Sequence, residues 1–392
     1  LLSYHTAYLK AHHPAAFMAA NLSLAMDDTD KIKILVEDAI DVCGLKLLPP
    51  DINLSDYRFT PVGEPGKKAI QIRYGLGAVK GSGQNAIEAI IAARQSGGPF
   101  ADLFDFVKRV DKRQINRRTI ESLIRAGAFD CFNVDRAILV ASVNFAMECA
   151  DQAEASANQV SLFGGDDNDD MKPEYVKAAP WTEKQKLTEE KSALGFYLSG
   201  HPFDAYAEEA RRFARTKLAS LEPAREPKLI AGVISAVRTQ MTQRGKMLIV
   251  TLDDSTATVD VTVYNELYDP NKHLFKEDEF LAVQGKVSED RFSGGLRITA
   301  DKVMDIGTAR TQYGRQFVLS LSSTAKTIDA AQLKNMLSSY RSESGLPLSL
   351  RYMRDGIKCE ILFGDEWRVQ PSDGLQVSLV ERLGRESVTV EY

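Results

Sequence analysis

One glycine-rich stretch decides the fold of the first half of the chain: Tyr74-Gly75-Leu76-Gly77-Ala78-Val79-Lys80-Gly81-Ser82-Gly83-Gln84-Asn85-Ala86-Ile87. A helical pattern begins near Gln84, directly after the last glycine. Because glycine has no Cβ atom, such a turn can adopt positive φ and approach another group closely. The N–H groups that open the next helix have no partner within the helix, and they are well placed to bind a phosphate.

This stretch resembles a helix-hairpin-helix module, which binds DNA without reading its sequence. The alternative is a plain glycine-rich turn before a helix, and this stretch alone favours neither. The candidate residues for contact with duplex DNA in the turn are Gly77, Lys80, Gly81, Ser82, Gly83 and Gln84.

Residues 108–125 are strongly basic, and Asp111 and Glu121 are their only acidic members. The basic side chains are Lys108, Arg109, Lys112, Arg113, Arg117, Arg118 and Arg125. A charge run of this kind is often just a solvated helix face, but beside the turn it can reach neighbouring phosphates. We therefore add Lys112, Arg113, Arg117 and Arg118 to the duplex-binding candidates.

Residues 1 to about 48 have apolar positions at helical spacing, and Pro49-Pro50 ends that region. Between about 56 and 75, two short strand patterns flank a Gly-Pro turn, which predicts a β-hairpin. Helical patterns then continue from Leu76 to about Ala150.

Residues 151–180 are poor in apolar side chains and rich in clustered acids, which predicts a flexible linker. Within it, Gln159-Val160-Ser161-Leu162-Phe163 resembles the bacterial sliding-clamp-binding motif. Leu162 and Phe163 have no local core to enter, so they can fill an apolar pocket on a partner, and Gln159 can satisfy polar groups at its edge. A chance match is the alternative for so short a pattern.

Residues 228–305 contain five candidate strands, at 229–239, 246–254, 257–264, 279–287 and 295–304, with a short helical segment at 266–275. This order matches the five-stranded Greek-key barrel called the OB-fold, which often binds single-stranded nucleic acid through basic and aromatic side chains. The candidates are Arg238, Arg244, Lys246, Tyr264, Arg291, Phe292 and Arg297. Exposed arginines and aromatics also occur on barrels that bind nothing. After the barrel, alternating strands and helices predict a small α+β domain.

The chain has 392 residues, 44% of them hydrophobic and 26% charged, which predicts several domains with cores of their own. Its net charge of −5 argues against a simple nucleic-acid coating protein. The four cysteines form no CxxC pair, and no apolar run is long enough for a membrane span, so we expect a cytoplasmic protein without a metal site. The opening residue is not Met, and we interpret the chain as a fragment of a longer protein.

The order of these modules resembles the C-terminal third of the alpha subunit of bacterial DNA polymerase III, a replicative polymerase of the C family. Strings that support the resemblance span residues 8–20, 48–53, 198–202 and 292–296. The expected fold class is therefore multidomain α+β: a helical region with a helix-hairpin-helix module (about 74–132), an OB-fold barrel and a small terminal α+β domain.

The resemblance implies a role for each part. Residues 1–48 correspond to the end of the fingers domain, and 49–215 to a domain that binds duplex DNA and the sliding clamp (beta subunit), the latter through Gln159, Leu162 and Phe163. Residues 216–310 correspond to the barrel near the single-stranded template, and 311–392 to the region that contacts the clamp-loader tau subunit. The catalytic palm, with its magnesium ions, is expected upstream of Leu1, so this part alone should be inactive. The alternatives are a non-enzymatic nucleic-acid-binding scaffold and a specialised, error-prone paralogue.

Overall fold

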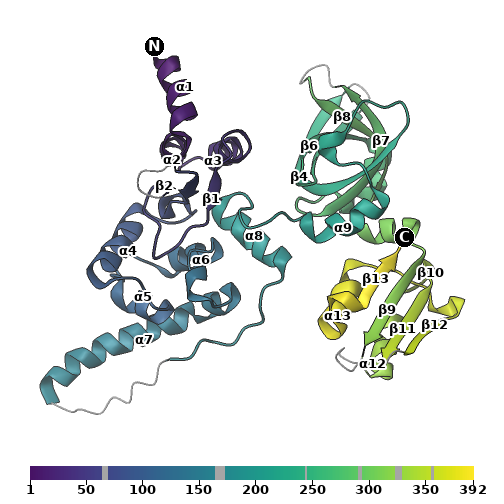
Figure 1. Ribbon diagram of the computed structural model, residues 1–392. Helices are drawn as coiled ribbons and strands as arrows, with labels where there is room; N and C mark the ends of the chain where they lie inside the picture. Colours follow the sequence, from purple (N-terminus) through teal and green to yellow (C-terminus); the bar gives the residue numbers. More distant parts are fainter. Residues whose placement is uncertain (64–68, 164–172, 243–244, 290–293, 323–328, 355–356) are drawn as a thin grey trace. The chain divides into compact units, whose positions relative to one another are not determined.

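The computed structural model describes the chain except for residues 64–68, 164–172, 243–244, 290–293, 323–328 and 355–356. The chain divides into two compact units, Leu1–His201 and Pro202–Tyr392. The first is mainly helical, and the second contains a barrel followed by a small α+β domain (Figure 1).

The first unit is built mainly from α-helices. They are α1 (Leu2–His12), α2 (Pro14–Leu24), α3 (Thr29–Glu37), α4 (Gln84–Gly97), α5 (Leu103–Arg109), α6 (Arg117–Arg125), α7 (Arg136–Phe163) and α8 (Glu183–Leu194). Apolar residues at helical spacing place one face of each in a shared core. On α6, for example, Ile120, Leu123 and Ile124 are fully buried.

A small sheet lies between α3 and α4 in the sequence. Its strands are β1 (Lys46–Leu48), β2 (Thr60–Val62) and β3 (Gln71–Arg73), in the order β1-β3-β2. The predicted hairpin is confirmed, because β2 and β3 pair antiparallel. Strand β1 pairs parallel to β3, which the sequence pattern did not predict.

The segment 151–180 differs from the predicted linker at both ends. Helix α7 continues to Phe163, since Ala and Glu at 153–155 favour a helix and Lys112 forms ion pairs with Asp151 (2.6 Å) and Glu154 (3.3 Å). Further on, the Val176 N–H donates to Ser142 Oγ on α7 at 2.9 Å. The described residues at both ends of the predicted linker therefore have defined contacts, which low hydrophobicity alone did not predict.

The second unit begins with α9 (Asp204–Phe213) and a closed barrel, which confirms the predicted five strands. They are β4 (Lys228–Thr242), β5 (Gly245–Asp253), β6 (Thr258–Tyr264), β7 (Phe280–Glu289) and β8 (Leu296–Met304), and α10 (Asn265–Tyr268) follows β6. The ladder runs β4-β5-β6-β8-β7, and β7 pairs back with β4. The seam between β6 and β8 is parallel and contains three residue pairs, Asp260–Arg297 to Thr262–Thr299.

The terminal domain has the sheet order β12-β11-β9-β13. Its elements are α11 (Ile306–Tyr313), β9 (Gln316–Ser322), α12 (Ala330–Ser338), β10 (Arg341–Leu346), β11 (Leu348–Arg354), β12 (Ile357–Leu362), α13 (Asp373–Leu383) and β13 (Val388–Glu391). The predicted α+β class is confirmed. Strand β10 lies outside this sheet and was not predicted, because its residues have no apolar alternation.

Candidate nucleic-acid interface

The N-terminus of α4 is an exposed helix end. Gly83 is its N-cap residue at φ −74°, and among the described residues no side chain caps this end. Gly83, Gln84 and Asn85 are all exposed, and a Cβ atom on Gly83 would meet nothing within 4 Å. The opening N–H groups and the positive end of the helix dipole are therefore available to an anion.

The turn before α4 is held rigidly by its own hydrogen bonds. Ser82 Oγ donates within the turn, to Val79 O (2.6 Å) and Leu76 O (2.9 Å). The Lys80 N–H donates to Ala193 O on α8 at 2.9 Å, while the Lys80 side chain is exposed. Gly81 has a φ of +80°, which favours glycine. Of these residues, Ser82 shapes the turn, and Lys80 faces solvent.

Gly77 serves packing within the protein. A Cβ atom at Gly77 would lie 2.5 Å from Tyr57 Cε2, and the Gly77 N–H donates to Tyr57 O at 3.0 Å. The close approach that Gly77 allows is thus to the segment before β2, and among the predicted turn glycines Gly81 and Gly83 remain the candidates for contact with a ligand.

Helix α6 begins beside this turn. Thr119 Oγ1 donates to Gly81 O at 3.3 Å, and a Cβ atom on Gly81 would lie 3.5 Å from Ser122 Oγ. Asn116 caps α6 by accepting a hydrogen bond from the Thr119 N–H at 3.0 Å. Two helix N-termini and the arginines that open α6 are consequently brought to one place.

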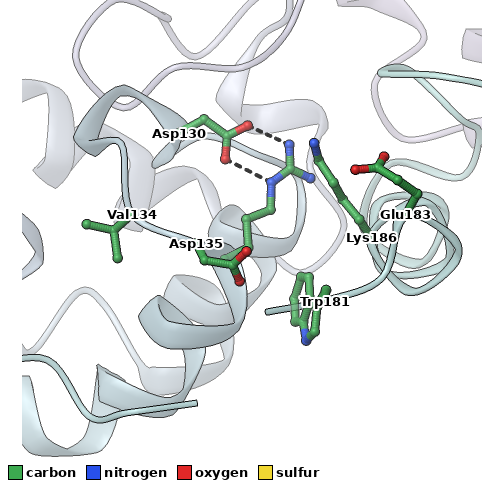
Figure 2. Close-up of a pocket in the computed structure, with 7 residues that line it drawn as sticks. Asp130, Val134, Asp135, Trp181, Glu183 and Lys186 are labelled. Atoms are coloured by element: carbon green, nitrogen blue, oxygen red, sulfur yellow. Dashed lines mark hydrogen bonds and ion pairs between the residues drawn. The ribbon is translucent and has the colours of Figure 1, made fainter. Parts of the chain in front are cut away.

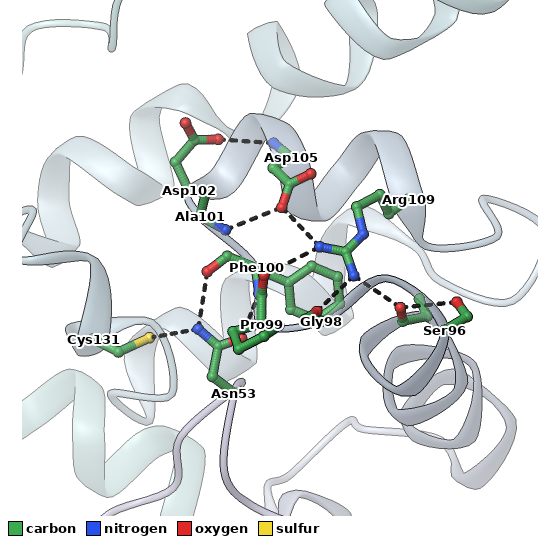
Figure 3. A network of polar contacts seen from close by, with 11 residues as sticks. Asn53, Ser96, Gly98, Pro99, Phe100, Ala101, Asp102, Asp105, Arg109 and Cys131 are labelled. Carbon is green, nitrogen blue, oxygen red and sulfur yellow. Dashed lines mark hydrogen bonds and ion pairs between the residues drawn. The ribbon is translucent and has the colours of Figure 1, made fainter.

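The structure separates the basic residues of 108–125 by what they contact. Arg109 is a structural residue (Figure 3): its guanidinium donates to Gly98 O (2.6 Å), Ala93 O (2.9 Å) and Asp105 (3.0 Å), and it lies over the Phe100 ring. It thereby satisfies carbonyl groups at the C-terminus of α4.

Four other basic residues in or beside this run are also engaged. Lys112 pairs with Asp151 and Glu154 of α7, and the hydrogen bond to Asp151 raises the pKa of Lys112. Arg117 pairs with Glu121, and Arg125 pairs with Glu121 and Glu189. Just outside the run, Arg136 is buried between Asp130 and Glu190.

Arg113 and Arg118 are different. Both are exposed, and neither forms an ion pair with any residue in the described ranges. Of the four predicted residues in this run, these two arginines are the ones whose charge is open to a phosphate.

The predicted clamp peptide ends α7. The backbone of Gln159, Leu162 and Phe163 is helical, but these side chains lie outside the described part of the chain. Their contacts stay a prediction.

On the barrel, strand alternation places three predicted residues on one outer face. Arg238 is paired with Ile249, Ile249 with Thr262, and Thr262 with Thr299. Tyr264 and Arg297 each lie two positions along from that row, so their side chains point the same way. Tyr264 is 38% exposed. The face also contains Asp260, whose carboxylate lies 3.6 Å from the Arg238 guanidinium.

Lys246 lies at the hairpin of β4 and β5, with its ammonium 5.0 Å from the centre of the Tyr268 ring. Lys272 lies over the same ring at 5.6 Å. Sequence reasoning missed Tyr268 and Lys272, although an aromatic and a lysine in the short helical segment after β6 were a usable signal. Arg244, Arg291 and Phe292 lie outside the described residues.

A small open pocket in the first unit contains none of the predicted residues. It is lined by Asp130, Val134, Asp135, Arg136, Trp181, Glu183 and Lys186 (Figure 2). Arg136 is held there by two hydrogen bonds to Asp130, at 2.6 and 2.8 Å. Among the described residues, no group of three or more His, Cys, Asp or Glu could hold a metal ion, and no helix is long and apolar enough to cross a membrane.

Three family models match the chain. They are the helix-hairpin-helix motif over residues 44–139, the OB-fold nucleic acid binding domain over 229–306, and the C-terminal domain of DNA polymerase III subunit alpha over 332–384. They follow the order of modules that the sequence predicts.

Full-length relatives match all of this chain. DNA polymerase III subunit alpha of Neisseria meningitidis serogroup B is 43% identical over 396 residues, and that of Escherichia coli K12 is 41% identical over 403. Each alignment covers 100% of this chain and 34% of the relative, so the chain spans about a third of their length. A solved OB-fold domain of replication protein A from Methanococcus maripaludis is 24% identical over 23% of this chain and 93% of that domain, with a TM-score of 0.20. The whole-chain matches confirm the resemblance to the alpha subunit.

Proposed function

We propose that this chain, which matches bacterial DNA polymerase III alpha subunits along its whole length, is the DNA-handling and partner-binding part of a replicative DNA polymerase. In this role it binds duplex DNA through phosphates and single-stranded template on the barrel, and it fastens the enzyme to the sliding clamp and the clamp loader. The whole protein is then a cytoplasmic DNA-directed DNA polymerase. Its palm domain and magnesium ions lie outside this chain.

The observation that carries the duplex-binding proposal is the pair of helix N-termini at Gly83 and Arg117. The uncapped end of α4 offers backbone N–H groups, and Arg118 and Arg113 add charges without protein partners in the described ranges. Backbone donors and arginines recognise phosphate oxygens and carry no base code, which supports binding that ignores sequence.

The test is the salt dependence of duplex binding by Arg113→Gln/Arg118→Gln, measured by fluorescence anisotropy. Each phosphate contact that is lost should lower the slope of log affinity against log salt by about 0.9. For the double variant, we expect the slope of log affinity against log salt to be smaller in magnitude by about 1.8. The affinity should be reduced equally for unrelated sequences.

The control is Lys46→Gln/Lys177→Gln, which removes the same charge from two exposed residues away from α4 and α6. If the control lowers the slope as much as the arginine variant, net charge and not this interface determines binding. Strong preference for one sequence would also contradict the proposal.

The clamp tether is the second part of the proposal. A peptide joined to the polymerase makes rebinding intramolecular, at an effective concentration on the order of millimolar. Its place at the C-terminal end of the long helix α7 supports access by a partner.

For Leu162→Ala/Phe163→Ala, we expect loss of binding to the bacterial sliding clamp in surface plasmon resonance and, in the whole polymerase, much shorter products with near-normal single-nucleotide addition. Val160→Ala is the matched control, since that position carries no proposed anchor. Undiminished clamp binding by the double variant would move the contact elsewhere.

Residues 311–392 are proposed to contact the tau subunit. Support comes from β12, an edge strand on which Ile361 and Leu362 are 48% and 70% exposed. Exposed apolar side chains on an unpaired edge are typical of a partner surface.

A further inference from the structure

The barrel face proposed for single strands has one carboxylate among its cations. Asp260 Oδ2 lies 3.6 Å from Arg238 Nη2, and Asp260 is the register partner of Arg297 across the β6–β8 seam. Its other oxygen, Oδ1, accepts a hydrogen bond from Thr251 Oγ1 at 2.7 Å. Thr251 therefore holds the acid beside Arg238, and its register partner Arg297 lies on the same face, which also presents Tyr264.

This ion pair is poorly suited to be a structural brace. The side chains of Arg238 and Asp260 are 67% and 40% exposed, so water and salt weaken their attraction, and exposed pairs contribute little to stability. The exposed carboxylate of Asp260 can, however, act on an incoming anion. A phosphate that approaches Arg238 meets a carboxylate already bound there, and within a Debye length of about 8 Å it is repelled by that charge.

We propose that Asp260 is an affinity-limiting residue of the single-strand surface. It offsets one of the two arginine charges and occupies Arg238, so that single-stranded DNA is held weakly and exchanges quickly. This inference rests on the proposed role of the barrel face. Weak binding suits a strand that must move continuously past the protein.

The test is Asp260→Asn in the complete chain, probed with a short oligothymidylate by fluorescence anisotropy at several salt concentrations. The amide has the shape of the carboxylate and keeps an acceptor for Thr251, so the barrel is expected to stay folded. Every protein compared also has Arg113→Gln/Arg118→Gln, which reduces binding by the helical unit. Affinity should rise about three- to tenfold at low salt. The salt slope should steepen by about 0.7, since Arg238 becomes able to neutralise one more phosphate.

Glu381→Gln is the matched control, because Glu381 is an exposed acid on α13, outside the barrel strands, and its loss changes the net charge equally. Unchanged or weaker binding by Asp260→Asn would overturn the inference, and weaker binding would make Asp260 a residue that positions Arg238. An equal gain in affinity in Glu381→Gln would also overturn the inference, because the net charge would then explain the effect.

Tyr264→Ala tests whether the barrel face binds the single strand at all, which is the proposed function on which the inference about Asp260 rests. If the barrel face binds the strand, loss of the ring should weaken binding, whatever Asp260 does. If Tyr264→Ala binds as tightly as the parent, the barrel face does not bind the strand, and the proposed function fails together with the inference. If Tyr264→Ala weakens binding and Asp260→Asn does not strengthen it, the inference alone fails.

Discussion

The basic residues between positions 108 and 125 cannot be distinguished by residue type, but their contacts in the structure differ. Arg109 satisfies the end of α4, Lys112 holds α7, and Arg113 and Arg118 face solvent. Residue type and spacing predicted that this run lies beside the turn. They could not predict which cations are occupied, because the partners Asp151, Glu154 and Glu189 lie far along the chain.

At the same scale, Gly81 and Gly83 provide a matched pair. An alanine at Gly81 must adopt a φ of +80°, whereas Gly83 has a φ of −74° and open space around it. We expect Gly81→Ala to lower the free energy of unfolding of the Leu1–His201 unit by about 1–2 kcal/mol. Gly83→Ala should change it by less than about 0.5 kcal/mol. Urea unfolding followed by circular dichroism measures both, and equal losses would mean that the turn is not strained at Gly81.

At the scale of elements, the pattern of apolar residues predicted the barrel strands and the helices well, because each buries one regular face. The apolar pattern did not predict the elements whose extent or pairing depends on long-range contacts. Helix α7 continues into an acidic segment that Lys112 stabilises, and β10 forms bridges to Val369 without any apolar alternation of its own. The parallel pairing of β1 with β3 was missed for the same reason.

Helix α8 contains a buried acid, Glu190, which forms a long-range contact of this kind with Arg136. Glu190 is 1% exposed, and its Oε1 accepts from the N–H groups of Leu198 (2.5 Å) and Ser199 (2.7 Å), while Oε2 lies 3.4 Å from Arg136. Glu190→Gln replaces charge-assisted bonds, so we expect a loss of about 2–3 kcal/mol in the free energy of unfolding of this unit.

Hydrogen exchange at the amides of Leu198 and Ser199 should quicken in Glu190→Gln. The neighbouring Glu189→Gln, at a half-buried pair with Arg125, should cost less, about 1 kcal/mol. If both variants lose the same free energy of unfolding, the burial of Glu190 does not account for its contribution to stability.

At the scale of the molecule, the barrel and the terminal domain belong to one unit, and a buried arginine connects their helices. Arg310 on α11 is 2% exposed and binds Glu209 of α9 (2.7 Å) and Asp373 of α13 (2.8 Å). Tyr206 and Tyr392 donate to the same two carboxylates. Nothing in the sequence around Arg310 distinguishes it from a surface arginine, since its partners lie 101 and 63 residues away.

Arg310→Ala leaves two partly buried carboxylates without their cation, and we expect a cost of about 3–5 kcal/mol. By calorimetry we expect a single transition for the parent unit and, for Arg310→Ala, a terminal domain that melts before the barrel. Arg382→Ala on the exposed side of α13 is the control and should leave the profile unchanged. A single, unshifted transition in Arg310→Ala would mean that the apolar contacts alone join the two parts.

The parallel seam between β6 and β8 has a consequence for the order of opening. The pairing of β6 with β8 has three residue pairs, whereas that of β4 with β5 has nine. Strands β6 and β8 should therefore separate first when the barrel is heated or pulled. On the same two strands, Asp260, Thr262, Arg297 and Thr299 belong to the face proposed for single strands, whereas Val261 and Ile298 between them are buried in the barrel core. A nucleic-acid strand bound across β6 and β8 would hold them together and slow local opening at this pairing, which is one of the weakest in the barrel.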